Sequence, residues 1–169
     1  MAVWLHERSV DCCFCAKPKG VVCDWIPVFQ DELVAWLPKD HPLAFGSSFP
    51  VKDLETEPFI HTSPNHDTDQ DRLLSELQIH PKTCFTTRDG FTTYNMVASG
   101  LGISFNQRLI AQKWDQSSVA QVPFDPPQFV ELGIAVPAMK EASPAARKLI
   151  ECAGRCISEM TGKFDEGLV

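Results

Sequence analysis

The sequence lacks the segments that would send the chain into or across a membrane. No apolar run approaches the about 18 residues that a spanning helix needs. Residues 1–8 lack the basic stretch followed by an apolar stretch that marks a secretory signal. Basic side chains are also in the minority, with 15 Lys and Arg against 22 Asp and Glu and a formal net charge of −7. This balance disfavours a surface for duplex nucleic acid, and the sequence predicts a cytoplasmic protein.

Local signatures of catalysis are absent as well. The chain contains neither a glycine-rich phosphate-binding loop nor a G-x-S-x-G turn that presents a nucleophile. His80 and Cys84 are close in sequence, but Pro81 lies between them and nothing else marks a nucleophile with its base. We therefore expect no enzymatic activity, no metal and no cofactor.

Cysteine is abundant, and four of the seven cysteines fall between residues 12 and 23. Without an export signal, reduced thiols are favoured over a disulfide scaffold. A zinc site usually contains a C-x-x-C pair, which the cluster lacks, and neighbours such as Cys12 and Cys13 point to opposite faces of a strand. The cluster is instead expected to act as small apolar residues in a strand at residues 9–16 that is buried on both faces.

Strand and helix patterns alternate along the rest of the chain, which makes a mostly parallel α/β sheet the default expectation. Apolar and β-branched runs predict strands at residues 32–37, 58–62, 83–87, 101–105, 119–124 and 130–136. Capping residues and helical spacing predict one turn at 51–54 and helices that start near residues 67, 90, 106 and 144. Ser143 followed by Pro144 is the clearest helix start, since serine caps well and proline suits the first helical position.

Proline interrupts the alternation twice, near residues 38–42 and at residues 125–127. The second interruption is expected to end a strand, because proline cannot donate to a central sheet ladder. Two breaks are typical of a chain that leaves one lobe, builds a second and returns. The predicted organisation is a partial first lobe from residues 1–42 and 127–160, a second lobe from residues 43–126 and a tail from residues 161–169. A ligand is expected between the lobes.

A series of segments follows the order found in one known family. The segments are residues 31–44, residue 54 with 57–60, residues 96–104, residues 131–135 and residues 143–147. Together they resemble the effector-binding domain of LysR-type transcriptional regulators. Residues 9–16 are similar to a buried strand of that domain, with cysteines in place of its usual apolar residues. No single segment is specific, but their order carries the resemblance.

The resemblance implies a two-lobed α/β fold of the periplasmic-binding-protein-like type 2 class. The first lobe is expected to be incomplete and the helix-turn-helix absent, because the elements that precede this region in the family are not found before Ser9. The implied function is a sensor that binds a small metabolite between its lobes to control transcription, with DNA contacted only through the absent helix-turn-helix. A missing strand leaves a sheet edge, so self-association as a homodimer or homotetramer is expected.

Two other functions stay open beside the sensor. A stand-alone solute-binding protein of the same fold is the first alternative, although it would need export. An enzyme with an unmarked site is the second.

The resemblance places two turns at the mouth of the ligand cleft. The first carries Thr62, Ser63 and His66; the second carries Phe91 and Thr92 and opens a helix whose free N–H groups suit the carboxylate or phosphate of an anionic effector. Asn106 stands where the family more often has an apolar residue, which brings a polar group near the cleft. The alternative for all six is an ordinary role in turns and helix caps.

Two further kinds of site are weighed in the same region. His61, His66, Asp67 and Asp69 are near one another and could hold a divalent cation, although an exposed loop is their simpler setting. A peroxide-sensing branch of the family uses a cysteine pair in this part of the second lobe. Residues 63–79 contain no cysteine, so thiol sensing by that route is not expected.

Overall fold

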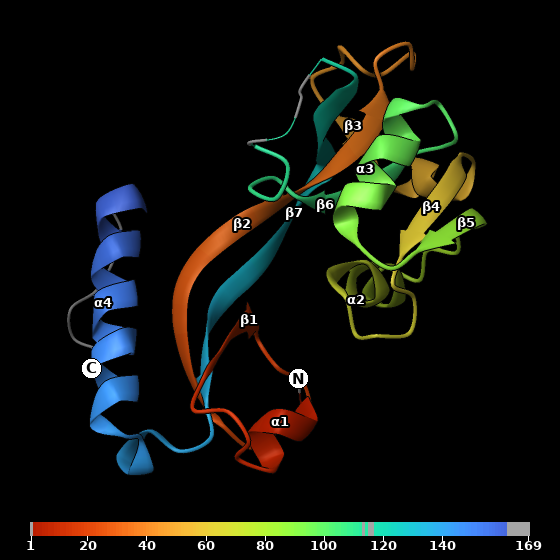
Figure 1. The fold of residues 1–169 in the computed structure, drawn as a ribbon. Helices are drawn as coiled ribbons and strands as arrows, with labels where there is room; N and C mark the ends of the chain where they lie inside the picture. Colours follow the sequence, from red (N-terminus) through yellow and green to blue (C-terminus); the bar gives the residue numbers. More distant parts are fainter. Residues whose placement is uncertain (1, 113, 115–116, 162–169) are drawn as a thin grey trace. The chain divides into compact units, whose positions relative to one another are not determined.

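The computed structural model describes residues 2–112, 114 and 117–161 (Figure 1). Contacts group the chain into two compact units, one from residues 1–30 with 131–169 and the other from residues 31–130. Both changes of unit fall inside long strands, β2 (Asp24–Pro38) and β7 (Val119–Val136), which are neighbours in one sheet. The sequence places its lobe limits nearby, at 42/43 and 126/127, and the limits of the ligand-binding lobes stay a prediction. Residues 162–169 of the predicted tail lie outside the described part.

The elements between residues 51 and 98, together with the last helix, begin near where local signals predict. The remaining elements are α1 (Ala2–His6), β1 (Cys13–Ala16), β3 (Phe49–Pro50), η1 (Val51–Glu55), β4 (Pro58–Thr62), α2 (Asp69–Glu76), β5 (Lys82–Thr87), α3 (Gly90–Ala98), β6 (Ser104–Gln107), η2 (Met139–Glu141) and α4 (Pro144–Thr161). The Ser143 hydroxyl accepts from the N–H of Ala146 at 3.1 Å, which confirms the predicted start of α4. Within the described residues, no helix is both long and apolar enough to cross a membrane.

The first unit is built from the lower parts of β2 and β7, with β1 and α4 packed on them (Figure 1). Its core joins Ile26, Val28, Ile134, Val136 and Ile150, of which the last lies on α4. The expectation that the cysteine-rich strand is buried on both faces is wrong. β1 lies at an edge of the five-stranded sheet with β7 as its neighbour, and the side chain of Phe14 is 57% exposed.

The second unit holds the aromatic core. Phe49, Phe59, Phe105 and Phe124 are fully buried and contact one another in a chain of ring pairs with centroids 5.5–6.1 Å apart. Offset and edge-to-face ring pairs of this kind stabilise a core beyond their buried area. The core packs beneath β4, β6 and η1, and it therefore fixes the strands whose ends form the site described below.

The α/β class is confirmed, but the mostly parallel sheet is not. β1 pairs with β7 and β2 pairs with β6 in antiparallel register, whereas β3 with β7 and β4 with β5 are parallel. The alternation of patterns misleads here because β2 and β7 are long strands that serve both units.

The helix predicted at residues 106–114 is wrong. Asn106 and Gln107 end β6, residues 108–112 form turns, and residue 113 lies outside the described part. The start of the segment is held to β2: the Leu109 N–H donates to Asp31 Oδ2 at 3.1 Å, and the Arg108 N–H donates to the backbone oxygen of Glu32 at 2.8 Å. The Ile110 N–H then donates to the Gln107 carbonyl at 3.2 Å, three residues back, which is the bond of a turn. These contacts outweigh the local helical spacing.

The strand break predicted at Asp125-Pro126-Pro127 is also wrong, since β7 continues without interruption from Val119 to Val136. The segment is tolerated because it is solvent-exposed, with residues 125–127 all exposed between buried stretches. Proline is accepted in a strand where its missing N–H would face solvent.

Candidate ligand-binding site

The carboxyl ends of three strand segments meet at one edge of the second unit. Thr62 at the end of β4 pairs with Thr87 at the end of β5 in parallel register. An isolated parallel bridge joins Phe59 to Ile103. Thr62 follows Phe59 by three residues and Asn106 follows Ile103 by three residues, so the two lie at the same level. In open α/β sheets, ligands bind outside the carboxyl ends of the strands. Thr62 and Asn106, two of the residues singled out in the sequence, are therefore brought to one edge.

The backbone of Thr62 is held by a buried glutamine from α2. The Thr62 N–H donates to Gln70 Oε1 at 2.8 Å, while Gln70 Nε2 donates to Ser104 Oγ at 3.0 Å and to the Phe105 carbonyl at 2.6 Å. Gln70 is only 3% exposed. One side chain thus ties α2 to β4 and β6, with both N–H groups of its amide nitrogen donating and its amide oxygen accepting.

The two predicted turns are hydrogen-bonded to each other. The Ser63 hydroxyl donates to the Arg88 carbonyl at 2.8 Å, and the Ser63 N–H donates to the Thr87 carbonyl at 2.9 Å. Ser63 adopts a φ of 47°, in the left-handed region that non-glycine residues seldom enter. A strained residue held by two bonds at a strand end is typical of a positioned site.

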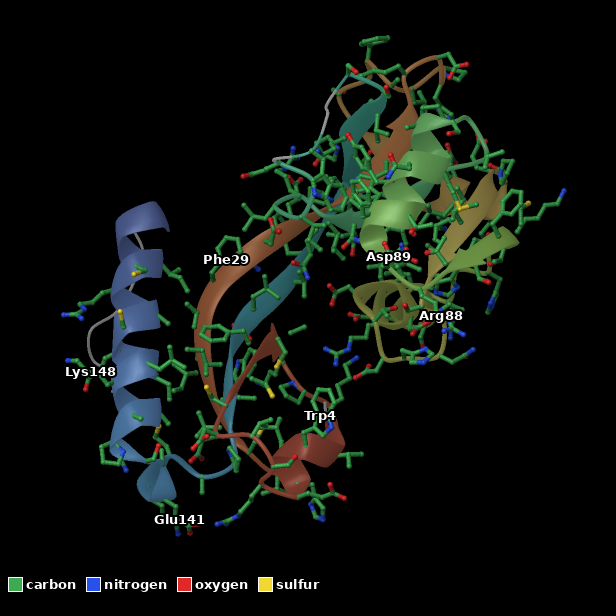
Figure 2. The ribbon with its side chains drawn as sticks, viewed as in Figure 1. Trp4, Phe29, Arg88, Asp89, Glu141 and Lys148 are labelled. Atoms are coloured by element: carbon green, nitrogen blue, oxygen red, sulfur yellow. The ribbon has the colours of Figure 1, made fainter. Side chains whose placement is uncertain are left out.

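The start of α3 is capped by its own chain. Asp89, shown beside Arg88 where β5 passes into α3 (Figure 2), accepts from the Thr92 N–H and from the Thr92 hydroxyl, both at 2.8 Å. These bonds lower the pKa of the Asp89 carboxyl, which favours its charged form. Of the N–H groups expected to be free for an anion, that of Thr92 is therefore already bonded to a carboxylate.

His66 is exposed, and it is bonded to its own loop and to the first turn of α2. Its N–H donates to Asp71 Oδ2 at 3.1 Å, and its Nδ1 lies 2.8 Å from the Pro64 carbonyl. Asp71 also closes a capping box with Thr68 at the start of α2. The nearby His61 is largely buried, with Nε2 3.1 Å from Asp71 Oδ1, and burial lowers its pKa against the opposing effect of Asp71.

The residues considered for a cation are engaged separately. Arg72 pairs with Asp67, and Gln107 Nε2 donates to Asp69 Oδ2 at 2.6 Å. In the part of the chain that the structure describes, no three His, Cys, Asp or Glu side chains converge as metal ligands would.

An aromatic side chain borders the polar groups. Phe91 is 57% exposed and contacts Trp114 edge-on, with ring centroids 5.3 Å apart. The Asn106 amide nitrogen lies 3.3 Å from where a Cβ on Gly90 would stand, which places Asn106 against the first turn of α3. The edge of the unit thus combines hydroxyl and amide groups with an exposed ring, as small-molecule sites do.

Sequence reasoning missed the buried polar residues behind this edge. Gln70, Thr87 and Thr93 are 3%, 9% and 0% exposed. A signal was present: Gln70 stands three and four residues before Leu73 and Leu74, and Thr93 stands four before Val97, so both occupy apolar helix faces. A polar residue on such a face is informative because its burial requires partners.

Residues 2–156 match the family model of the LysR substrate binding domain. The chain belongs to this family. YvbU and YybE, HTH-type transcriptional regulators of Bacillus subtilis (strain 168), are 29% and 31% identical over 89% and 85% of this chain. The chain spans 51% of the length of each of these curated relatives.

A solved structure of a regulatory domain shares the fold. The CcmR regulatory domain of Synechocystis PCC6803, solved in complex with 2-PG, superimposes with a TM-score of 0.81 at 19% identity, over 94% of this chain and 78% of that chain. The predicted family and the periplasmic-binding-protein-like fold of this LysR substrate-binding domain are both confirmed.

Proposed function

We propose that this LysR substrate-binding domain senses a small metabolite at the carboxyl ends of β4, β5 and β6 and thereby controls transcription. The observation that carries the proposal is the parallel register that brings Thr62, Ser63 and Asn106 to one edge, next to the exposed ring of Phe91. The relatives are transcriptional regulators, which supports a sensor over a solute carrier or an enzyme.

The effector is expected to combine hydrogen-bonding groups with an apolar part. Thr62, Ser63, Thr92 and Asn106 supply polar contacts, and Phe91 supplies an apolar surface. We also propose that the effector carries an anionic group, which Arg88, the cationic residue of the second turn, would attract. The capping carboxylate of Asp89 opposes such a group at the start of α3, so an anion is expected to bind nearer Arg88 than the helix end.

Binding is proposed to act by favouring one arrangement of the regulator over another. The shift is limited by the difference in effector affinity between the two arrangements. DNA contact would come through a helix-turn-helix domain outside this chain, and the sensor would act in the cytoplasm as part of a homodimer or homotetramer.

A metabolite library screened by thermal shift, with hits mapped by amide chemical-shift changes, tests the site. We expect hits to shift the amides of residues 61–66, 88–93 and 104–107. Thr62→Ala should weaken their binding about five-fold, the factor for one net hydrogen bond. Thr83→Ala is the matched control, because Thr83 is exposed at the opposite end of the same pair of strands. Shifts confined to residues 1–30 and 131–161, or equal affinity of both variants, would place the effector elsewhere.

A further inference from the structure

Three threonine hydroxyls form a chain behind the proposed site. Thr93 Oγ1 lies 2.7 Å from Thr62 Oγ1 and 2.6 Å from Thr87 Oγ1. It also lies 3.1 Å from the Asp89 carbonyl, to which it can donate, and Thr87 Oγ1 lies 3.3 Å from the same carbonyl. Thr93 is 0% exposed and Thr87 is 9% exposed, so neither can turn to bulk water.

The protons of this chain can be counted. Two hydroxyl oxygens at 2.6–2.7 Å must share one proton between them, since two lone pairs at that distance repel. Thr93 has one proton and two lone pairs. If Thr62 and Thr87 both donate to Thr93, the Thr93 proton is left for the Asp89 carbonyl, and all three contacts of Thr93 become hydrogen bonds.

Two other arrangements share out the protons differently. In one, Thr62 still donates inward to Thr93, Thr93 donates to Thr87, and Thr87 turns to the Asp89 carbonyl at the longer distance of 3.3 Å. In the other, Thr93 donates to Thr62, Thr87 donates to Thr93, and the Thr62 proton points away from these three hydroxyls. That last arrangement leaves the Asp89 carbonyl without a hydroxyl donor, so it has one internal hydrogen bond fewer than the first.

We propose that Thr93 is a positioning residue for effector specificity: it draws the Thr62 proton inward, so that Thr62 Oγ1 presents lone pairs to the effector. The effector therefore carries an N–H or O–H group opposite Thr62. This inference rests on the proposed function, because it assigns a polarity to one group of that site. An effector that offers only an acceptor to Thr62 forces the proton outward and loses one internal hydrogen bond, about five-fold in affinity.

The inward direction of the Thr62 proton has a measurable consequence without any effector, because a proton donated to the buried Thr93 exchanges slowly with water. In a 1:1 mixture of H2O and D2O, a hydroxyl that exchanges slowly gives two resolved ¹³Cβ signals. We expect the pair for Thr62 in the full chain and in Thr93→Ser, which keeps the hydroxyl, and a single averaged signal in Thr93→Val. A single Thr62 signal in the unaltered chain, or a pair that persists in Thr93→Val, would overturn the proposal.

Small probes test the consequence for binding. Methylammonium carries N–H donors, tetramethylammonium has the same charge without them, and dimethyl sulfoxide offers only an acceptor. We expect methylammonium to change the chemical shift of the Thr62 amide more than either other probe. In Thr93→Val, we expect dimethyl sulfoxide to cause a larger change than methylammonium. Equal shifts, or no shift from any probe, would contradict the donor preference. If the ¹³Cβ result holds while library hits map elsewhere, the proposed site fails and the inward Thr62 proton stands.

Discussion

At the scale of single residues, the candidate site is held in place by side chains that are themselves buried. Gln70 holds the N–H of Thr62 and Thr93 contacts its hydroxyl, so a half-buried threonine is fixed from two sides. The family resemblance pointed to the turn that carries Thr62, and its hydroxyl made it a candidate contact. Its partners lie 8 and 31 residues away, and no local pattern encodes which of them it meets. The exposed candidates could therefore be named from the sequence and the resemblance and stay a prediction, whereas the buried partners of Thr62 could not be named.

His61 gives this residue scale a pH dependence. Burial holds the pKa of its imidazole below the ordinary value of 6.5. The unfolded chain therefore binds a proton at His61 before the folded chain does, and the stability that this group contributes above pH 6.5 is lost as the pH falls below that value. Urea unfolding of the unaltered chain should show a free energy of unfolding that decreases between pH 7.5 and pH 5.5.

His61→Gln should make that decrease shallower, because the titrating group is gone. His66→Gln is the control: His66 is an exposed histidine in the neighbouring loop, and its replacement should leave the slope unchanged. Identical slopes for His61→Gln and the unaltered chain would mean that another group governs this pH range.

At the scale of elements, prediction succeeded where the signal is local. Ser143 starts α4 and Asp89 caps α3, because a cap is a bond between residues three positions apart. The errors at residues 106–114 and 125–127 have the opposite origin. The first segment forms turns that are bonded to Asp31 and Glu32, more than 70 residues away, and the second remains a strand because its surroundings leave it exposed. Tertiary contacts overrode local preference in both.

The attachment of α2 yields a prediction at this scale. Gln70→Leu keeps the volume but leaves the Thr62 N–H and the Phe105 carbonyl without their partner in a buried setting. Each unsatisfied buried group costs about 1–3 kcal/mol, so the variant should lose about 3 kcal/mol of stability. Chemical denaturation measures the loss. Gln112→Leu, at an exposed position, should change stability by less than about 0.5 kcal/mol. Equal effects would show that the buried bonds of Gln70 contribute little.

At the scale of the whole molecule, the chain passes twice between its units. The first unit is discontinuous: Ile26 and Val28 from the early segment pack with Ile134 and Ile150 from the late one. The sequence predicted a chain that leaves one lobe and returns, from two proline-rich segments. Those segments mark the neighbourhood of the crossings, but the crossings themselves are long uninterrupted strands. Such strands were not foreseeable, because strand length depends on neighbours that the local sequence does not reveal.

The edge of the first unit predicts how copies of the chain behave together. β1 ends the order β1-β7-β2-β6, and the ring of Phe14 on β1 is 57% exposed. An edge strand with an exposed aromatic residue pairs readily with another chain, so sedimentation velocity should show a concentration-dependent oligomer. Phe14→Lys should shift the distribution toward monomer, because a charge on an edge strand opposes pairing. Phe129→Lys is the matched control, since Phe129 is 54% exposed on β7. A chain that stays monomeric at every concentration, or equal effects of the two lysine substitutions, would contradict self-association through β1.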